Sequence, residues 1–163
     1  MTARIVRIAG TLTTMVSVLL ADCGSNGSGS EDRRTATVEV ARQYQQAMLD
    51  KEWKVACEMR TERLRGGTVA ACIKETDVPR LNEYPDARVR TGEPFEIEAS
   101  GAHEAGVGLR VSVSLDPTTG LRIDSALRLV PGGAKVWLVD QAVNLDEFTR
   151  KDQESVRAAL RRR

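Results

Sequence analysis

The chain has 163 residues, and its 24 Lys and Arg residues nearly balance its 23 Asp and Glu residues, so the formal net charge is +1. A nucleic-acid-binding domain usually carries a clear basic excess, and this balance argues against that class. Hydrophobic residues make up 41% of the chain, which is enough for one domain with a single core.

The first 23 residues have the order of an export signal. Arg4 and Arg7 give a basic start, residues 8–21 carry no charge, and the sequence LADC ends at Cys23. The uncharged run is shorter than the roughly 20 residues that a membrane-spanning helix needs. The segment resembles a bacterial lipoprotein signal, which implies cleavage after residue 22 and a diacylglycerol group on the Cys23 sulfur. Asp22 departs from that pattern, and if it prevents lipidation we expect a secreted protein or a retained N-terminal anchor.

Residues 1–22 are therefore predicted to be a signal peptide, and residues 23–34 a flexible linker. The Gly and Ser residues after Cys23 give such a segment reach, and charged residues at 31–34 keep it solvated. We expect this linker to hold the folded domain, residues 35–145, clear of the membrane headgroups. Residues 146–163 are predicted to form a C-terminal helix with a basic tail.

Three helices are predicted before residue 77. Apolar residues recur at helical spacing between Val40 and Met48, which indicates a first helix beginning near residue 35. A turn at residues 50–52 precedes a second predicted helix, from Trp53 to Leu64, which the two glycines after it would end. A short third helix is predicted to begin at the N-cap residue Thr68.

The second and third predicted helices each carry one cysteine, Cys57 and Cys72. Two thiols in an exported protein are normally oxidised, and once Cys23 is assigned to lipid only one pairing is left. A disulfide closing this loop would contribute about 3 kcal/mol. The alternative is a pair of buried free thiols. No metal site is expected, because two cysteines without a nearby histidine do not complete a zinc shell.

The period of the sequence changes from helical to alternating after residue 94. Residues 77–94 contain three prolines and are predicted to be irregular. Apolar and polar residues then alternate, which predicts antiparallel strands with one buried and one solvated face; Arg128 falls on the predicted solvated face. The predicted strands are residues 95–99, 107–115, 121–129 and 136–143.

Helices followed by an antiparallel meander predict an α+β fold, with the N-terminal helices packed on the concave face of a curved sheet. The helix from Val38 to Leu49, followed by Trp53 and Cys57, a second Cys about 15 residues on and a meander, resembles the NTF2-like, cystatin-related domains of actinobacterial lipoproteins. The resemblance covers residues 35–145 and implies a cone-shaped domain. That superfamily includes both enzymes and non-catalytic modules, so it does not fix a function.

Enzymes of this superfamily place a base and a hydrogen-bond donor inside the cone. The predicted inward strand positions carry no carboxylate and no histidine. The candidate pocket residues are Tyr44, on the first helix, and Asp140, on the last strand. We expect Asp140 to be a solvated strand-end residue, and His103, the single histidine, to lie unoriented in a hairpin loop.

These observations predict a membrane-tethered, extracytoplasmic and non-catalytic module that binds a protein partner or a small apolar ligand. No cofactor, metal or nucleic acid is expected. One alternative is a cyclase- or isomerase-like enzyme, which requires Tyr44 and Asp140 to converge in one pocket. Another is a structural accessory lipoprotein of a cell-envelope complex.

Overall fold

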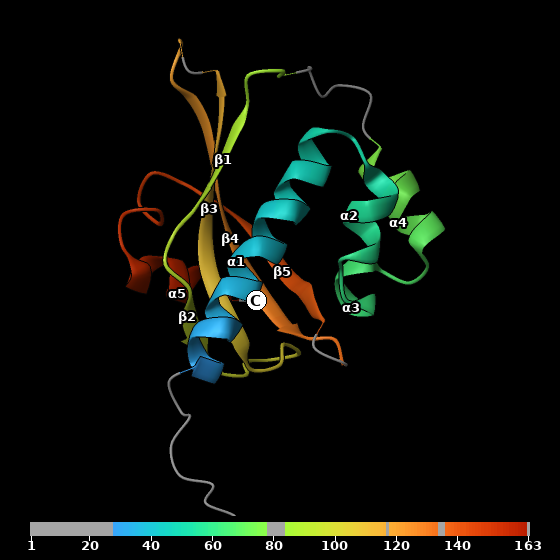
Figure 1. The fold of residues 1–163 in the computed structure, drawn as a ribbon, viewed down its shortest axis with the longest axis vertical. Helices are drawn as coiled ribbons and strands as arrows, with labels where there is room; N and C mark the ends of the chain where they lie inside the picture. Colours follow the sequence, from blue (N-terminus) through green and yellow to red (C-terminus); the bar gives the residue numbers. More distant parts are fainter. Residues whose placement is uncertain (1–27, 78–83, 117, 134–135, 163) are drawn as a thin grey trace, which may run out of the picture.

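The protein folds as a five-stranded antiparallel sheet with helices packed against both faces (Figure 1). The computed structural model describes residues 28–77, 84–116, 118–133 and 136–162. The described helices are α1 (Ser28–Leu49), α2 (Trp53–Glu58), α3 (Glu62–Arg65), α4 (Val69–Thr76) and α5 (Gln153–Arg161). Helix α1 crosses one face and α5 covers part of the other, so the predicted α+β class is confirmed.

The strands are β1 (Arg88–Thr91), β2 (Phe95–Ile97), β3 (Gly106–Asp116), β4 (Leu121–Pro131) and β5 (Trp137–Leu145). Their order in the sheet is β1-β3-β4-β5, with β2 also paired to β3. The four strands predicted from alternation are present. The irregular structure predicted for residues 77–94 is wrong over β1, an edge strand that pairs with β3 although Val89 is its only apolar residue.

Helix α1 begins at Ser28, so the linker predicted over residues 23–34 is wrong for residues 28–34. Glu31 lies in the first turn, where a negative charge complements the helix dipole. Thr37, six residues farther on, is fully buried and donates its hydroxyl to the Arg33 and Arg34 carbonyl oxygens. The folded part of the chain therefore starts closer to Cys23 than the sequence predicts.

The second predicted helix is interrupted between α2 and α3. Val139 of β5 exchanges backbone hydrogen bonds with Met59 and Thr61, at 2.8 and 2.9 Å, which pulls this stretch out of the helix. Thr61 then caps α3 by accepting the Leu64 N–H. The Cys57–Cys72 disulfide is present, with an S–S distance of 2.03 Å, and it joins α2 to α4 as predicted.

Two clusters of buried side chains lie on opposite faces of the sheet. Tyr44 and the rest of the inner face of α1 pack on Leu109, Leu127 and Val139. On the other face, α5 covers a second cluster that includes Phe95. The last predicted helix starts later than expected, at Gln153, because the Asp146 carboxylate accepts the Phe148 and Thr149 N–H groups in a turn.

Helix α5 also changes the environment of Arg128. This residue was predicted on the solvated face, but its side chain is fully buried beneath α5. Its guanidinium donates to the carbonyl oxygens of Glu98, Glu104 and Leu160, at 3.2, 2.9 and 3.0 Å. Burial lowers the pKa of Arg128 from its ordinary value. Arg128 therefore ties the β2–β3 connection to the end of α5.

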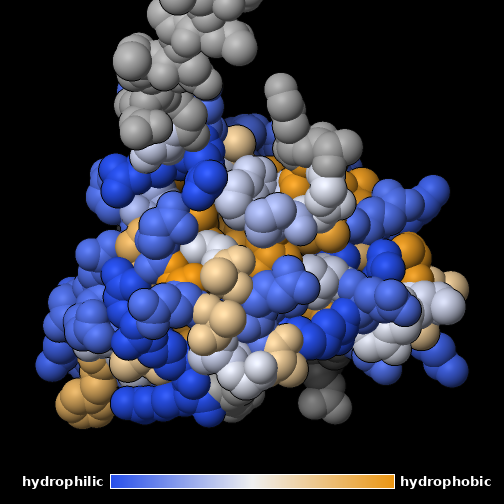
Figure 2. Space-filling view, turned by 90° about the horizontal axis from the view of Figure 1, so that it is seen from below, coloured by the Kyte–Doolittle hydropathy of each residue, from blue (hydrophilic) through white to orange (hydrophobic). Residues whose placement is uncertain are grey.

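Figure 2 views the molecule from the end at which α1 begins. Most of this end is hydrophilic, and hydrophobic residues show mainly between charged ones. Among the described residues, no helix has both the length and the apolar character needed to cross a membrane.

Candidate functional site

The first candidate site is an apolar groove, here called the Tyr44 groove, between α1 and the upper part of the sheet. Helical spacing places Tyr44, Gln45, Met48 and Leu49 along one side of it. The groove encloses about 280 Å³, and its lining is mainly apolar. The opposite wall and the floor are formed by Tyr84, Val113, Leu115, Ile123, Ser125, Ala142 and Asn144.

Ile123 shows that the apolar lining continues to the surface, since it is 45% exposed beside the groove. An isoleucine that lies open beside a concave apolar surface is where an apolar ligand would gain the most from burial.

Tyr44 supplies a hydrogen-bond donor to this groove. Its ring is buried, and its hydroxyl accepts a 3.1 Å hydrogen bond from Arg60 Nε, while the Arg60 guanidinium lies 5.6 Å from the ring centroid. Arg60 also donates to the sulfurs of Met48 and Cys72. The Tyr44 hydroxyl donates to no described residue, so its hydrogen is available to an acceptor on a ligand.

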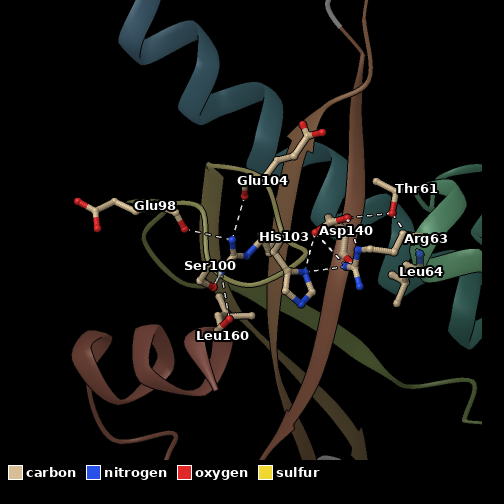
Figure 3. Close-up of polar contacts among 10 residues, drawn as sticks. Thr61, Arg63, Leu64, Glu98, Ser100, His103, Glu104, Asp140 and Leu160 are labelled. Atoms are coloured by element: carbon tan, nitrogen blue, oxygen red, sulfur yellow. Dashed lines mark hydrogen bonds and ion pairs between the residues drawn. The ribbon is translucent and has the colours of Figure 1, made fainter. Parts of the chain in front are cut away.

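The second candidate site is a polar cluster of Asp140, Arg63 and His103. Register places Gln141 opposite Arg128 and Val139 opposite Leu129, so Asp140 is the extra residue of a β-bulge in β5. Its carboxylate accepts a 3.0 Å hydrogen bond from Thr61 Oγ1 and lies 2.9 Å from Arg63 Nη2. His103 Nδ1 lies 2.8 Å from Asp140 Oδ2 (Figure 3). The bulge turns this side chain out of the strand alternation and toward α3.

The contacts of Asp140 fix the tautomer of His103. An ionised carboxylate only accepts, so Nδ1 carries the proton and donates to Asp140. Arg63 Nη2 lies 2.7 Å from the same nitrogen, but both are donors, so Arg63 bonds to Asp140 instead. Figure 3 shows Nε2 pointing away from Asp140.

Two expectations from the sequence are wrong at this cluster. Asp140 was predicted to be solvated and His103 unoriented, but they are only 5% and 6% exposed and are bonded to each other. Burial disfavours the charged form of Asp140, but hydrogen bonds from His103, Arg63 and Thr61 outweigh it and hold the pKa of Asp140 below its ordinary value. Asp140 is therefore ionised at neutral pH.

The loop that carries His103 is fixed by its neighbours. Ser100 and His103 exchange two backbone hydrogen bonds of 3.0 Å across a tight turn, in which Gly101 adopts a positive φ of 59°. The Ser100 hydroxyl accepts from Arg128 Nη2 at 3.1 Å. Arg128 therefore holds the loop in place beneath α5, and the loop presents the imidazole to Asp140 (Figure 3).

Tyr44 and Asp140, the two predicted pocket residues, do not line the same hollow. Tyr44 lines the Tyr44 groove, whereas Asp140 lines a separate hollow of about 200 Å³ together with Arg63, His103 and Gln141. Within the described part of the chain, no serine, threonine or cysteine hydrogen bonds to His103 Nε2.

Among the described residues, no group of three or more His, Cys, Asp or Glu side chains could hold a metal ion. The predicted lipidation residue Cys23 lies outside the described residues, as does the predicted signal peptide. No family model, curated protein or solved structure matches this chain.

Proposed function

We propose that this protein is a non-catalytic NTF2-like module that is tethered to the outer face of the cytoplasmic membrane through Cys23 and binds a small apolar ligand. The ligand would lie in the Tyr44 groove. The observation that carries this proposal is the apolar lining of that groove, which the Tyr44 side chain also lines. The helices packed on one face of an antiparallel sheet support the NTF2-like assignment, and the basic and apolar order before Cys23 supports the tether.

The size of the groove favours a small ligand over a protein partner. Its volume of about 280 Å³ is near the lower end of the range for small-molecule sites. A stable protein interface takes roughly 20–30 residues from each partner, whereas eleven residues line this groove. An acyl chain or a small ring system with one carbonyl or carboxylate group matches a mainly apolar groove that the Tyr44 side chain also lines.

Decanoate is a suitable probe because it combines an apolar chain with one acceptor group. Isothermal titration calorimetry should detect its binding to the wild-type protein. Ala142 is exposed and lines the groove, so Ala142→Trp should fill the groove and abolish binding. Tyr44→Phe removes one hydrogen bond of about 1 kcal/mol and should weaken binding about fivefold.

Ala102→Trp is the matched control, because Ala102 is also exposed but lies in the His103 loop. This variant should bind decanoate like the wild type. Unchanged affinity in Ala142→Trp would overturn the assignment of the groove. The tether has its own test: the intact mass of protein extracted from its host membranes should begin at Cys23 and include a diacylglycerol group.

A further inference from the structure

Four arginines gather on the same sheet face as α5, in the part of it that α5 leaves uncovered. Arg88 and Arg90 come from β1, Arg110 from β3 and Arg122 from β4. Arg88 pairs with Ser114, which in turn pairs with Arg122. Directly opposed residues of an antiparallel sheet point to the same face, so these side chains share one surface. Together they line a hollow of about 550 Å³, here called the arginine hollow.

The arginine hollow carries an excess of positive charge. Asp124 is the one carboxylate that the structure bonds to these arginines within its described residues; it is buried and lies 2.9 Å from Arg122 Nε. Asp124 also pairs with Arg150 and accepts a hydrogen bond from the Ser112 hydroxyl. Its single negative charge is therefore already shared between two arginines. Arg88 and Arg90 are exposed and form no ion pair with a described residue.

The floor of the arginine hollow is polar. None of the remaining lining residues is a large apolar one. They are small or carry a hydroxyl group: Thr91, Gly92, Ser112, Ser114 and Gly120. This composition contrasts with the Tyr44 groove, which lies on the other face of the sheet. A hollow with a cationic rim and a hydroxyl-bearing floor suits an anion rich in oxygen acceptors rather than an apolar ligand.

We propose that the arginine hollow binds an anion that carries two or more phosphate groups. A guanidinium presents parallel N–H donors that pair with two phosphate oxygens at once. The arginines stand on β1, β3 and β4, and neighbouring strands are about 4.8 Å apart, so the cationic groups spread over roughly 10 Å. That spread exceeds one phosphate and matches a linked pair or a row of phosphates. The proposal does not depend on the ligand of the Tyr44 groove.

The test is titration of the full-length protein, in mild detergent, with inorganic phosphate, pyrophosphate and tripolyphosphate. Tripolyphosphate should bind tightest, and added salt should weaken the binding. Arg88→Gln combined with Arg90→Gln should weaken it at least tenfold. Because both side chains are exposed and unpaired, this variant should keep the wild-type circular dichroism spectrum.

The control is Arg34→Gln combined with Arg42→Gln. It also removes two positive charges, but from the exposed side of α1. Its affinity should stay within about twofold of the wild type. An equal loss in the control would mean that net charge alone attracts the anion, and would overturn the site. Failure of the wild type to bind any phosphate-bearing probe would also overturn it.

Vesicles of phosphatidylglycerol distinguish the source of the phosphate. One outcome is that the wild type cosediments with the vesicles but does not bind tripolyphosphate. If the Arg88 and Arg90 double variant then no longer cosediments, this outcome would support the site and assign it to lipid headgroups. Binding of tripolyphosphate without vesicle binding would support a soluble phosphate ligand or polymer.

Discussion

The Cys57–Cys72 disulfide gives a prediction whose size can be calculated. The bond closes a loop with a sequence separation of 15 residues. In the chain-entropy model, such a cross-link lowers the entropy of the unfolded chain by about 10 cal/mol/K, which stabilises the folded state by about 3 kcal/mol at 25 °C. Reduction should therefore lower the free energy of unfolding by that amount and the melting temperature by about 10 °C.

Urea denaturation of a Cys23→Ser protein, followed by circular dichroism with and without reductant, measures this difference. Cys23→Ser removes the third thiol, so only the Cys57–Cys72 bond responds to reductant. The double variant Cys57→Ala, Cys72→Ala should lose more than reduction does, because both sulfurs are buried and Arg60 donates to the Cys72 sulfur.

A difference below about 1 kcal/mol between the oxidised and reduced proteins would refute the entropic reasoning. It would mean that the segment from α2 to α4 is already compact in the reduced, unfolded chain. A higher m-value in the reduced protein would support the same reasoning, because an unfolded chain without the cross-link exposes more surface.

The remaining predictions concern the polar cluster and the second core. Asp140→Asn should destabilise the protein by about 2 kcal/mol at neutral pH, since it removes a buried carboxylate that accepts from Thr61 and pairs with the partly exposed Arg63. The pKa of Asp140 is lowered on folding, so its stabilisation is present above its unfolded-state pKa of about 3.9 and is lost as pH falls through the folded value. Urea midpoints of the wild type and variant should therefore converge toward acid pH, and a constant gap would contradict the ionic role. Gly108→Ala should cost about 1–3 kcal/mol by thermal denaturation, because a methyl group there would lie 2.5 Å from the Phe95 ring; a neutral effect would mean that the Phe95 ring can shift to make room. Arg128→Met should cost about 2–4 kcal/mol and speed hydrogen exchange in the His103 loop, since it leaves buried carbonyl oxygens without donors; unchanged exchange would contradict its role as a tie.

Local patterns in the sequence predicted much of the fold. Alternation located the strands from residue 95 onward, and the cap at Thr68 is confirmed by a hydrogen bond from Ala71 N–H. The disulfide followed from a count of thiols. Strand β1 could not be predicted in this way, because an edge strand with one apolar residue has no alternating signal. Its extended backbone is held by its pairing with β3.

The polar cluster could not be predicted because it depends on contacts between distant residues. Asp140 meets residues 37 and 77 positions away, and it does so through a one-residue bulge that alternation cannot locate. Arg128 presents the same difficulty: a polar residue between two leucines has the pattern of a solvated strand position. Only the packing of α5 over that face reveals that its charge is buried.

The early start of α1 limits how far the protein can stand from an anchor at Cys23. Five peptide steps separate Cys23 from Ser28, and a fully extended chain of that length reaches at most about 18 Å. Helix α1 then runs 22 residues, roughly 33 Å, away from that end, and the β3–β4 hairpin lies at the far end of the molecule (Figure 1). A lipid on Cys23 would thus tether the domain to the membrane through a short segment. It would keep the β2 end close to the bilayer and turn the arginine hollow away from it.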